Sequence, residues 1–232
     1  MQRTLFQISG APPSWRVRLG LAFKGIQVDI RTLTTSDREE GDFDIRKLNI
    51  RGTLPVLMDN DVSVHNSIAI LAWLDRQYPQ TPLFGATPGD ALEIWQLVMT
   101  CYDDFREANR QLLTVVFASR GELPEKGSFE ADMLETGATQ AHVECRYLEA
   151  RLSDGRPYLC GDHLSAAEAL VYPEVRLIQR AAATKPKLMQ AVGLGDMRQL
   201  YPYISTWMDR LEAMPEVAGT MPEHWAETLA VN

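Results

Sequence analysis

Residues 53–67 carry the groups best suited to hold a peptide-like ligand. Two β-prone runs in this segment are joined by residues 59–61, whose Asp-Asn-Asp composition is typical of a tight turn. Pro55 stands just before the first run, where a strand tolerates proline, and we predict a cis Leu54–Pro55 bond. That bond turns the N–H and C=O of Leu54 outward, where an extended peptide can pair with them.

Asn66 and Ser67 supply a second kind of binding group. They stand at the start of an apolar helical run, residues 68–74. The N–H groups at a helix start, together with a serine hydroxyl, attract a carboxylate. Residues 53–67 therefore combine backbone pairing with carboxylate capture, although a hairpin followed by a capped helix is also common as plain structure.

The first third of the chain shows the patterns of the strands and helices that would hold these groups in place. Their order is βαβαββα: a strand at 5–8, a helix at 14–24 closed by Gly25, a strand at 26–30, a helical stretch at 43–48, the hairpin, and a helix ending at Tyr78. Two strands joined by a helix pair in parallel, whereas a hairpin is antiparallel. This order predicts a mixed four-stranded sheet flanked by helices.

The rest of the chain has a different pattern. Residues 79–90 are rich in proline and glycine, and strand-like alternation stops after them. Ser165 and Glu168 form the pattern of a capping box, with Leu164 placed as a hydrophobic staple. Long helical patterns cover residues 91–119, 129–152, 165–183 and 204–214. We therefore predict an α/β domain at 1–80 followed by an all-helical domain at 88–232.

Composition limits the classes of partner. The 232 residues are 45% hydrophobic and 23% charged, which suits a globular chain of one large or two modest domains. The formal charge of −8 and the lack of a Lys/Arg cluster argue against nucleic acid and anionic membranes as partners. No apolar run approaches the roughly 18 residues of a membrane helix, and the first residues read as a strand rather than a signal peptide. We therefore expect a cytoplasmic protein.

The cysteines indicate neither a disulfide framework nor a metal site. Cys101, Cys145 and Cys160 are odd in number and widely spaced, without a C-x-x-C or His-flanked pattern. The turn between the first strand and helix contains no cysteine, and none occurs between residues 1 and 100. A glutaredoxin-like thiol–disulfide enzyme, which needs a cysteine at that turn, is therefore not supported.

Several ordered motifs carry a family resemblance that covers nearly the whole chain. They are Asn49 to Pro55, Asn66-Ser67, Gly161 to Glu168, Tyr201 to Trp207, and Met214-Pro215. Together they resemble the soluble glutathione transferases. Residues 14–18, 24–26 and 65–67 are most similar to the zeta class, which contains the maleylacetoacetate isomerases. The resemblance implies a thioredoxin-like N-terminal domain, an all-helical C-terminal domain, glutathione as cofactor and a homodimer.

The resemblance also implies roles for the segment described first. Leu54 and Pro55 would hold the cysteinyl part of glutathione by backbone pairing. Asn66 and Ser67 would hold the γ-glutamyl carboxylate, with Asn66 shorter than the usual Gln or Glu. The implied activity is that of a transferase or glutathione-dependent isomerase, in which the thiolate attacks a small electrophile.

One departure from the family pattern bears on catalysis. The zeta pattern Ser-Ser-Cys-Ser falls on residues 11–14, so Ala11 stands where the family keeps its principal catalytic serine. Pro12 and Pro13 also remove backbone N–H groups, which leaves those of Ser14 and Trp15. We predict that Ser14 supplies the hydroxyl that stabilises the thiolate; the alternative is that Ser14 only caps its helix. Loss of thiol activation would leave a binding or scaffold protein.

Substrate-side residues follow from the resemblance too. Arg180 matches the arginine that meets a substrate carboxylate in the zeta enzymes, and a guanidinium suits that task. Tyr102 and Phe105 are candidates for an apolar substrate wall. The alternatives are a solvated helix face for Arg180 and interhelical core for the two aromatic residues.

Overall fold

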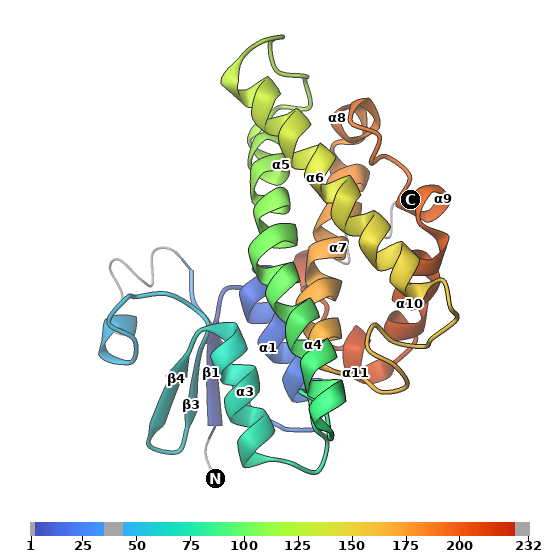
Figure 1. Ribbon diagram of the computed structural model, residues 1–232. Helices are drawn as coiled ribbons and strands as arrows, with labels where there is room; N and C mark the ends of the chain where they lie inside the picture. The colour runs from blue at the N-terminus through green and yellow to red at the C-terminus, as the bar shows by residue number, and fades with distance from the viewer. Residues whose placement is uncertain (1–2, 35–43, 226–232) are drawn as a thin grey trace.

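The computed structural model describes residues 3–34 and 44–225. Figure 1 shows a sheet with its helices at the lower left and a larger group of helices at the upper right. The first region consists of β1 (Arg3–Gln7), α1 (Pro12–Phe23), β2 (Asp29–Thr32), the 3-10 turn η1 (Ile45–Lys47), β3 (Val56–Asp59), β4 (Val62–His65) and α3 (Ser67–Gln77).

The sheet has the predicted mixed topology. Its strand order is β2-β1-β3-β4, with β1 parallel to β2 and the other two pairs antiparallel. Leu5 pairs with Ile30 on one side and with Leu57 on the other, which fixes the register of the central strand. The buried residues Leu5 and Leu57 pack with Val17 of α1 and Ile70 of α3, so both helices cover the same apolar face.

Two predicted elements of this region differ from the structure. The helical stretch predicted at 43–48 is only the three-residue turn η1, and Phe43 lies outside the described residues. Of the three residues in η1 only Ile45 is buried, so there is no apolar stripe to extend the turn into an α-helix. The second strand starts at Asp29 rather than at residue 26 and is exposed throughout.

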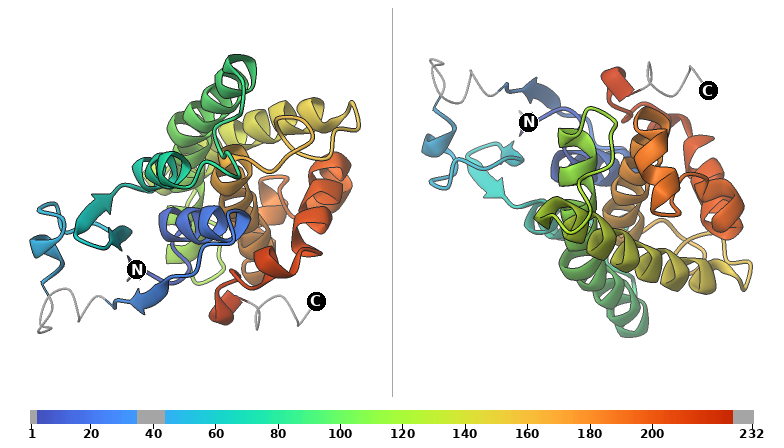
Figure 2. Two further views of the ribbon diagram at one scale, coloured as in Figure 1. Left: turned by 90° about the horizontal axis from the view of Figure 1, so that it is seen from below. Right: turned by 90° about the horizontal axis from the view of Figure 1, so that it is seen from above.

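Helix α1 begins two residues before the predicted start. Pro12 and Pro13 occupy its first two positions, where a missing N–H costs nothing because those groups have no helical partner. At the other end, Gly25 adopts φ +63°, a left-handed conformation that closes the helix as predicted. Most residues of α1 are buried, because the helix lies between the sheet and the C-terminal helices (Figure 2).

The second region is all-helical, as predicted. Its elements are α4 (Pro88–Thr100), the π-helical turn η2 (Cys101–Phe105), α5 (Arg106–Ala118), α6 (Phe129–Leu152), α7 (Ala166–Thr184), α8 (Pro186–Ala191), α9 (Met197–Leu200), α10 (Pro202–Glu212) and α11 (Pro215–Ala218). The helix predicted at 91–119 is thus interrupted by η2. The sequence patterns missed α8, α9 and α11, which have four to six residues and too few turns for a periodic signal.

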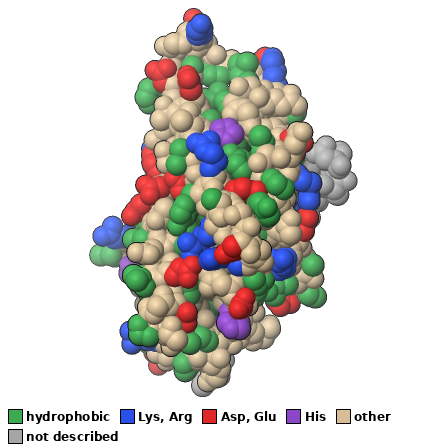
Figure 3. All heavy atoms as spheres, turned by 45° about the vertical axis from the view of Figure 1, so that its right-hand side comes forward, with side chains coloured by type: hydrophobic (Ala, Val, Ile, Leu, Met, Phe, Trp, Pro, Cys, Tyr) green, Lys and Arg blue, Asp and Glu red, His purple; other side chains and the backbone are tan. Residues whose placement is uncertain are grey.

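Helix α7 connects the two regions. It packs on α1, α4 and α5, and its N-terminus has the predicted capping box between Ser165 and Glu168. The segment between α3 and α4 is docked rather than loose, because Leu83 is buried and its carbonyl accepts from the Ala166 N–H at 2.8 Å. In the described part of the chain, every helix is too short or too polar to span a bilayer. Figure 3 shows acidic and basic side chains intermixed over one face.

Candidate functional site

A cavity of about 580 Å³ lies where the loop before β3 and the start of α3 meet α1 and η2. Its size falls in the range of small-molecule sites. The described residues that line it include four with basic side chains and none with a carboxylate. They are Pro13, Arg16, Arg51, Thr53, Leu54, Pro55, His65, Asn66, Ser67, Tyr102 and Arg106. The lining is therefore suited to an anionic ligand.

Leu54 and Pro55, the backbone segment predicted to pair with a peptide and here called the ledge, lie directly before β3. The Leu54–Pro55 bond is cis, as predicted, and the paired residues of β3 begin at Val56, so Leu54 lies outside the ladder. The loop before it is fixed by Asn49, whose Nδ2 donates to the carbonyl and the Oγ1 of Thr53, both at 2.9 Å. This buried asparagine explains why an Asn precedes the ledge.

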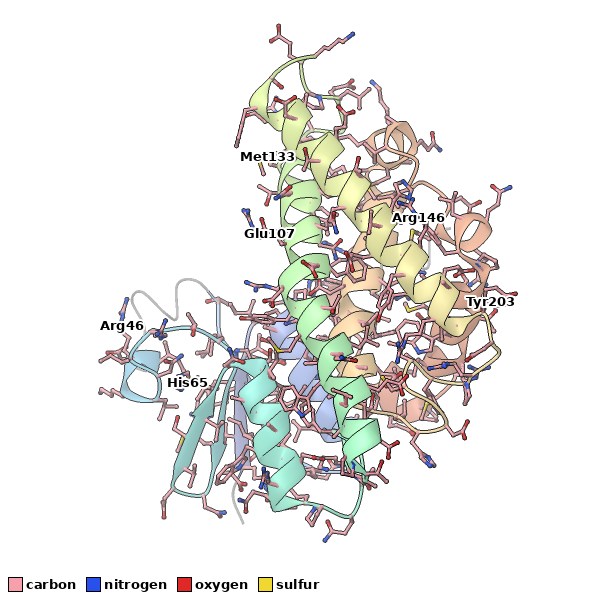
Figure 4. All side chains as sticks on the ribbon, in the orientation of Figure 1. Arg46, His65, Glu107, Met133, Arg146 and Tyr203 are labelled. Carbon is pink, nitrogen blue, oxygen red and sulfur yellow. The ribbon has the colours of Figure 1, made fainter. Side chains whose placement is uncertain are left out.

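The start of α3 forms the opposite side of the cavity. Asn66 is the N-cap, and its Oδ1 accepts from the N–H groups of Ile68 at 3.0 Å and Ala69 at 3.4 Å. Because the oxygen is used by the helix, the side chain offers N–H donors rather than an acceptor to a ligand. Ser67 is the first helical residue, nearly buried, and borders the cavity. His65 lies at the end of β4 (Figure 4).

The start of α1 has fewer free hydrogen-bond donors for a thiolate than the sequence predicts. Ala11 is its N-cap, so Ser14 is neither the cap nor the first residue of the helix. The backbone N–H groups of Ser14 and Trp15 both donate to the Ala11 carbonyl at 3.0 Å. The Ser14 side chain is buried, its Oγ accepts from the Ile8 N–H at 3.2 Å, and it is absent from the cavity lining. This geometry favours a structural role for Ser14.

Arg16 is a cavity residue that the sequence reading missed. It is fully buried, and its Nη2 donates to Glu174 Oε1 at 2.5 Å. Nε and Nη1 have no hydrogen-bond partner among the residues that the structure describes. The other basic residues missed are Arg51, His65 and Arg106. No sequence signal marked Arg16 as a cavity residue, because the predicted helix starts at residue 14 and α1, buried on most sides, has no polar face to show which way Arg16 points.

A second cavity, of about 320 Å³, adjoins the first. Both are bordered by Pro13 and Arg106, and the second lies between the start of α1, α5 and α7. Leu113, Phe117 and Leu177 give it apolar walls. A ligand in the first cavity can thus meet a partly apolar molecule in the second.

The predicted substrate residues lie in three different settings. Tyr102 lines the first cavity, and the Arg106 guanidinium lies 4.8 Å from the centre of its ring. Phe105 is in the interhelical core and is not a cavity residue. Arg180 lies over the rings of Phe117 at 5.1 Å and Trp225 at 5.0 Å, and burial lowers its pKa. It is absent from the lining of both cavities but contacts Phe117, a wall of the second.

The three cysteines lie outside the lining of both cavities. Burial raises the pKa of Cys145 and of Cys160 to about 12 and also raises that of Cys101. None of the three lines either cavity. Within the described ranges, no three His, Cys, Asp or Glu side chains are grouped to hold a metal ion. The cysteines of this chain therefore supply no thiol to either cavity.

Comparison with known proteins gives the family. Residues 5–82 match the glutathione S-transferase N-terminal domain, and residues 106–215 match the glutathione S-transferase C-terminal domain. The chain belongs to the glutathione S-transferase family. The two matches confirm the predicted family and the predicted fold, a thioredoxin-like sheet domain followed by an all-helical domain.

Relatives of this transferase-family protein include zeta-like enzymes. Glutathione S-transferase Z1 of Arabidopsis thaliana is 40% identical over 68 residues, which are 29% of this chain and 31% of that protein. A probable maleylacetoacetate isomerase of Vibrio cholerae is 24% identical over 216 residues, 91% of each chain. A glutathione S-transferase structure from the Antarctic clam Laternula elliptica has a TM-score of 0.78 and 26% identity, covering 98% of this chain and 95% of that one. The match to the plant enzyme spans about a third of its length.

Proposed function

We propose that this protein binds glutathione in the first cavity and is a glutathione transferase-like enzyme acting on a small electrophile in the second. The main support for this proposal is that Leu54 and Pro55, just before β3, and Ser67, at the start of α3, line one cavity whose lining is basic. Glutathione has a peptide backbone and two carboxylates. Leu54 and Pro55 would hold its cysteinyl part, and Asn66 and Ser67 its γ-glutamyl carboxylate.

The adjoining cavities suit attack by the sulfur on a second molecule. In a transfer, the sulfur forms a bond to an electrophilic carbon while the leaving group departs with the bonding pair. In an isomerisation, the sulfur adds to a conjugated double bond and is expelled after rotation about the resulting single bond. The probable maleylacetoacetate isomerase of Vibrio cholerae is named for a reaction of the second kind. Arg106, which borders both cavities, would border the electrophile, and Tyr102 would lie on the glutathione side.

Calorimetry followed by an activity panel tests this proposal. We expect saturable binding of both glutathione and S-methylglutathione, and glutathione-dependent turnover of at least one of activated aryl halides, maleylacetone or peroxides. If neither glutathione nor S-methylglutathione binds, the proposal is overturned. Binding without turnover leaves only the binding function.

A binding or scaffold protein is the second candidate, because Ala11 has no hydroxyl and the N–H groups of Ser14 and Trp15 are used within the helix. The two candidates differ in the state of the bound sulfur. An enzyme lowers the pKa of the bound thiol below the roughly 8.5 of a free cysteine, whereas a scaffold leaves it near that value. A titration of the ultraviolet absorbance of the thiolate separates them.

We also propose that the protein is a homodimer joined through the face formed by β4, α3 and α4. Val62, Leu92 and Met99 are exposed on this face, and a hollow of about 660 Å³ runs between the elements. Such an apolar face suits a partner surface. Sedimentation velocity should give twice the chain mass, and Met99→Glu should give the monomer. Leu123→Glu, a matched change at an exposed leucine outside this face, should leave the dimer intact.

A further inference from the structure

Arg16 is a fully buried cation that borders the first cavity without using all its donors. Its Nη2 is paired with Glu174, whereas Nε and Nη1 have no hydrogen-bond partner in the part of the chain described. Burying an N–H without a partner is unfavourable, because the lost hydration is not replaced. An anion in the cavity would complete the hydrogen bonding of the guanidinium.

The position of Arg16 relates it to the junction of the two cavities. It follows Pro13 by three residues and Pro12 by four, so all three lie on one face of α1. Pro13 borders both cavities, and Arg16 shares the first cavity with Leu54 and Pro55. Arg16 thus borders the same cavity as the segment proposed to hold the sulfur, and it shares a helix face with the residue that borders both cavities.

Residues of α5 and α7 fix the position of the Arg16 guanidinium. Glu174 of α7 accepts from Arg16 through Oε1, and its Oε2 accepts from Asn109 Nδ2 at 2.8 Å. The same Nδ2 donates to the Glu174 carbonyl at 3.1 Å. Both oxygens of Glu174 are thus occupied, so the carboxylate is fixed and Nε and Nη1 of Arg16 stay buried without a hydrogen-bond partner among the described residues. The ring of Tyr102, a residue of the first cavity, lies 6.0 Å from the guanidinium carbon.

On the basis of the glutathione site proposed above, we propose that Arg16 stabilises the thiolate of bound glutathione through Nε and Nη1, while Glu174 and Asn109 position its guanidinium. The sulfur loses its proton to solvent, and Arg16 remains protonated throughout. A nearby fixed cation favours a thiolate over a thiol. In this chain the charge of Arg16 replaces the hydroxyl that Ala11 lacks.

Other charged and titratable groups also act on this sulfur. Glu174 opposes Arg16, and the remaining groups come from the elements packed around the cavity. They are Arg51, His65, Cys101, Tyr102 and Arg106 around the first cavity and Arg110 in the lining of the second. The basic members are present in every variant considered below, so differences between variants report Arg16 and Glu174.

The test compares two variants whose effects on the thiol are opposite. Arg16→Gln/Glu174→Gln removes both charges together and avoids leaving one unpaired in the interior. It should raise the pKa of bound glutathione by about 1 to 2 relative to wild type. Glu174→Gln alone keeps the cation without its counter-ion and should lower that pKa. Ultraviolet titration of the thiolate measures both, and the affinity for S-methylglutathione, which has no thiol, should stay nearly constant.

Each outcome supports or overturns the role of Arg16 or the glutathione site itself. If the double variant binds S-methylglutathione but titrates bound glutathione as wild type does, the role of Arg16 is wrong while the glutathione site stands. If wild type binds glutathione without lowering its pKa, Arg16 does not stabilise the thiolate. If wild type binds neither peptide, both proposals fail. Should the double variant not fold, Glu174→Gln decides: an unchanged pKa overturns the inference and a lowered one supports it.

Discussion

At the scale of single residues, Ser67 is the side chain that tests the ligand cavity most directly. It is nearly buried at the first position of α3 and borders the cavity. Ser67→Ala should weaken glutathione binding by about 1 to 2 kcal/mol, because one hydrogen bond to a carboxylate is lost. Calorimetry gives the affinity, and Ser153→Ala, at the exposed end of α6, is the control. Equal affinities for the two variants would remove Ser67 from the site.

Ser14, unlike Ser67, is expected to affect stability rather than ligand binding. Its Oγ accepts from the Ile8 N–H and lies outside the cavity lining, so it joins β1 to α1. Ser14→Ala should lower the free energy of unfolding by about 1 kcal/mol, since the Ile8 N–H loses its partner. Urea unfolding measures this, and the pKa of bound glutathione should not change. A raised thiol pKa in a fully stable variant would restore the catalytic role predicted from the sequence.

At the scale of elements, the start of α7 shows how one carboxylate organises two segments. Glu168 is fully buried; its Oε1 accepts from the Leu159 N–H at 2.6 Å. Its Oε2 accepts from the N–H of Ser165 at 2.8 Å and from the Ser165 hydroxyl at 2.7 Å. Burial raises the pKa of Glu168, and these three donors oppose that shift. The carboxylate therefore fixes both the helix start and the loop before it.

Glu168→Gln should be strongly destabilising. The amide replaces one acceptor with an NH2 group, which must face an N–H or O–H donor whichever way it turns. We expect a loss of about 2 to 4 kcal/mol in the free energy of unfolding. Urea denaturation measures it, and Glu135→Gln, exposed on α6, should stay within about 0.5 kcal/mol of wild type. Similar values for the two variants would contradict this role of Glu168.

At the scale of the whole molecule, the segment after α11 closes over the start of the chain. Trp225 packs edge-on against Trp15 with ring centres 5.1 Å apart, and the Trp15 Nε1 donates to Thr220 Oγ1 at 2.8 Å. Gly10 lies beneath this segment: a Cβ at that position would be 2.7 Å from Trp225 Nε1. The turn that precedes α1 is thus held by residues more than two hundred positions away.

Two glycine substitutions separate this contact from backbone conformation. Gly10 and Gly25 both have positive φ, +78° and +63°, but a Cβ at Gly25 would meet nothing within 4 Å. Gly25→Ala should cost about 1 kcal/mol of stability, the price of the left-handed conformation. Gly10→Ala should cost more, about 2 to 4 kcal/mol, because the C-terminal segment must also move. Urea unfolding and proteolysis of that segment measure the difference, and equal losses would show that the contact contributes nothing.

Elements that depend on neighbouring residues could be predicted from the sequence. Two β-prone runs joined by a polar turn indicated the hairpin, and Pro55 indicated the cis bond. Asn66 marked the start of α3, and Ser165 and Glu168 marked the start of α7. Each depends on residues within a few positions, so the pattern alone specifies it. The domain boundaries at 80 and 88 and the roles assigned to the site residues stay predictions.

Which side chains meet in the cavity could not be predicted from the sequence, because it depends on the packing of distant helices. Helix α1 is buried on most sides, so it has no polar face from which the directions of Ser14 and Arg16 could be read. The partner of Arg16 is Glu174, 158 positions away, and Phe105 enters the core while Tyr102 reaches the cavity. Such contacts depend on how distant helices pack, and no pattern within a short segment contains that information.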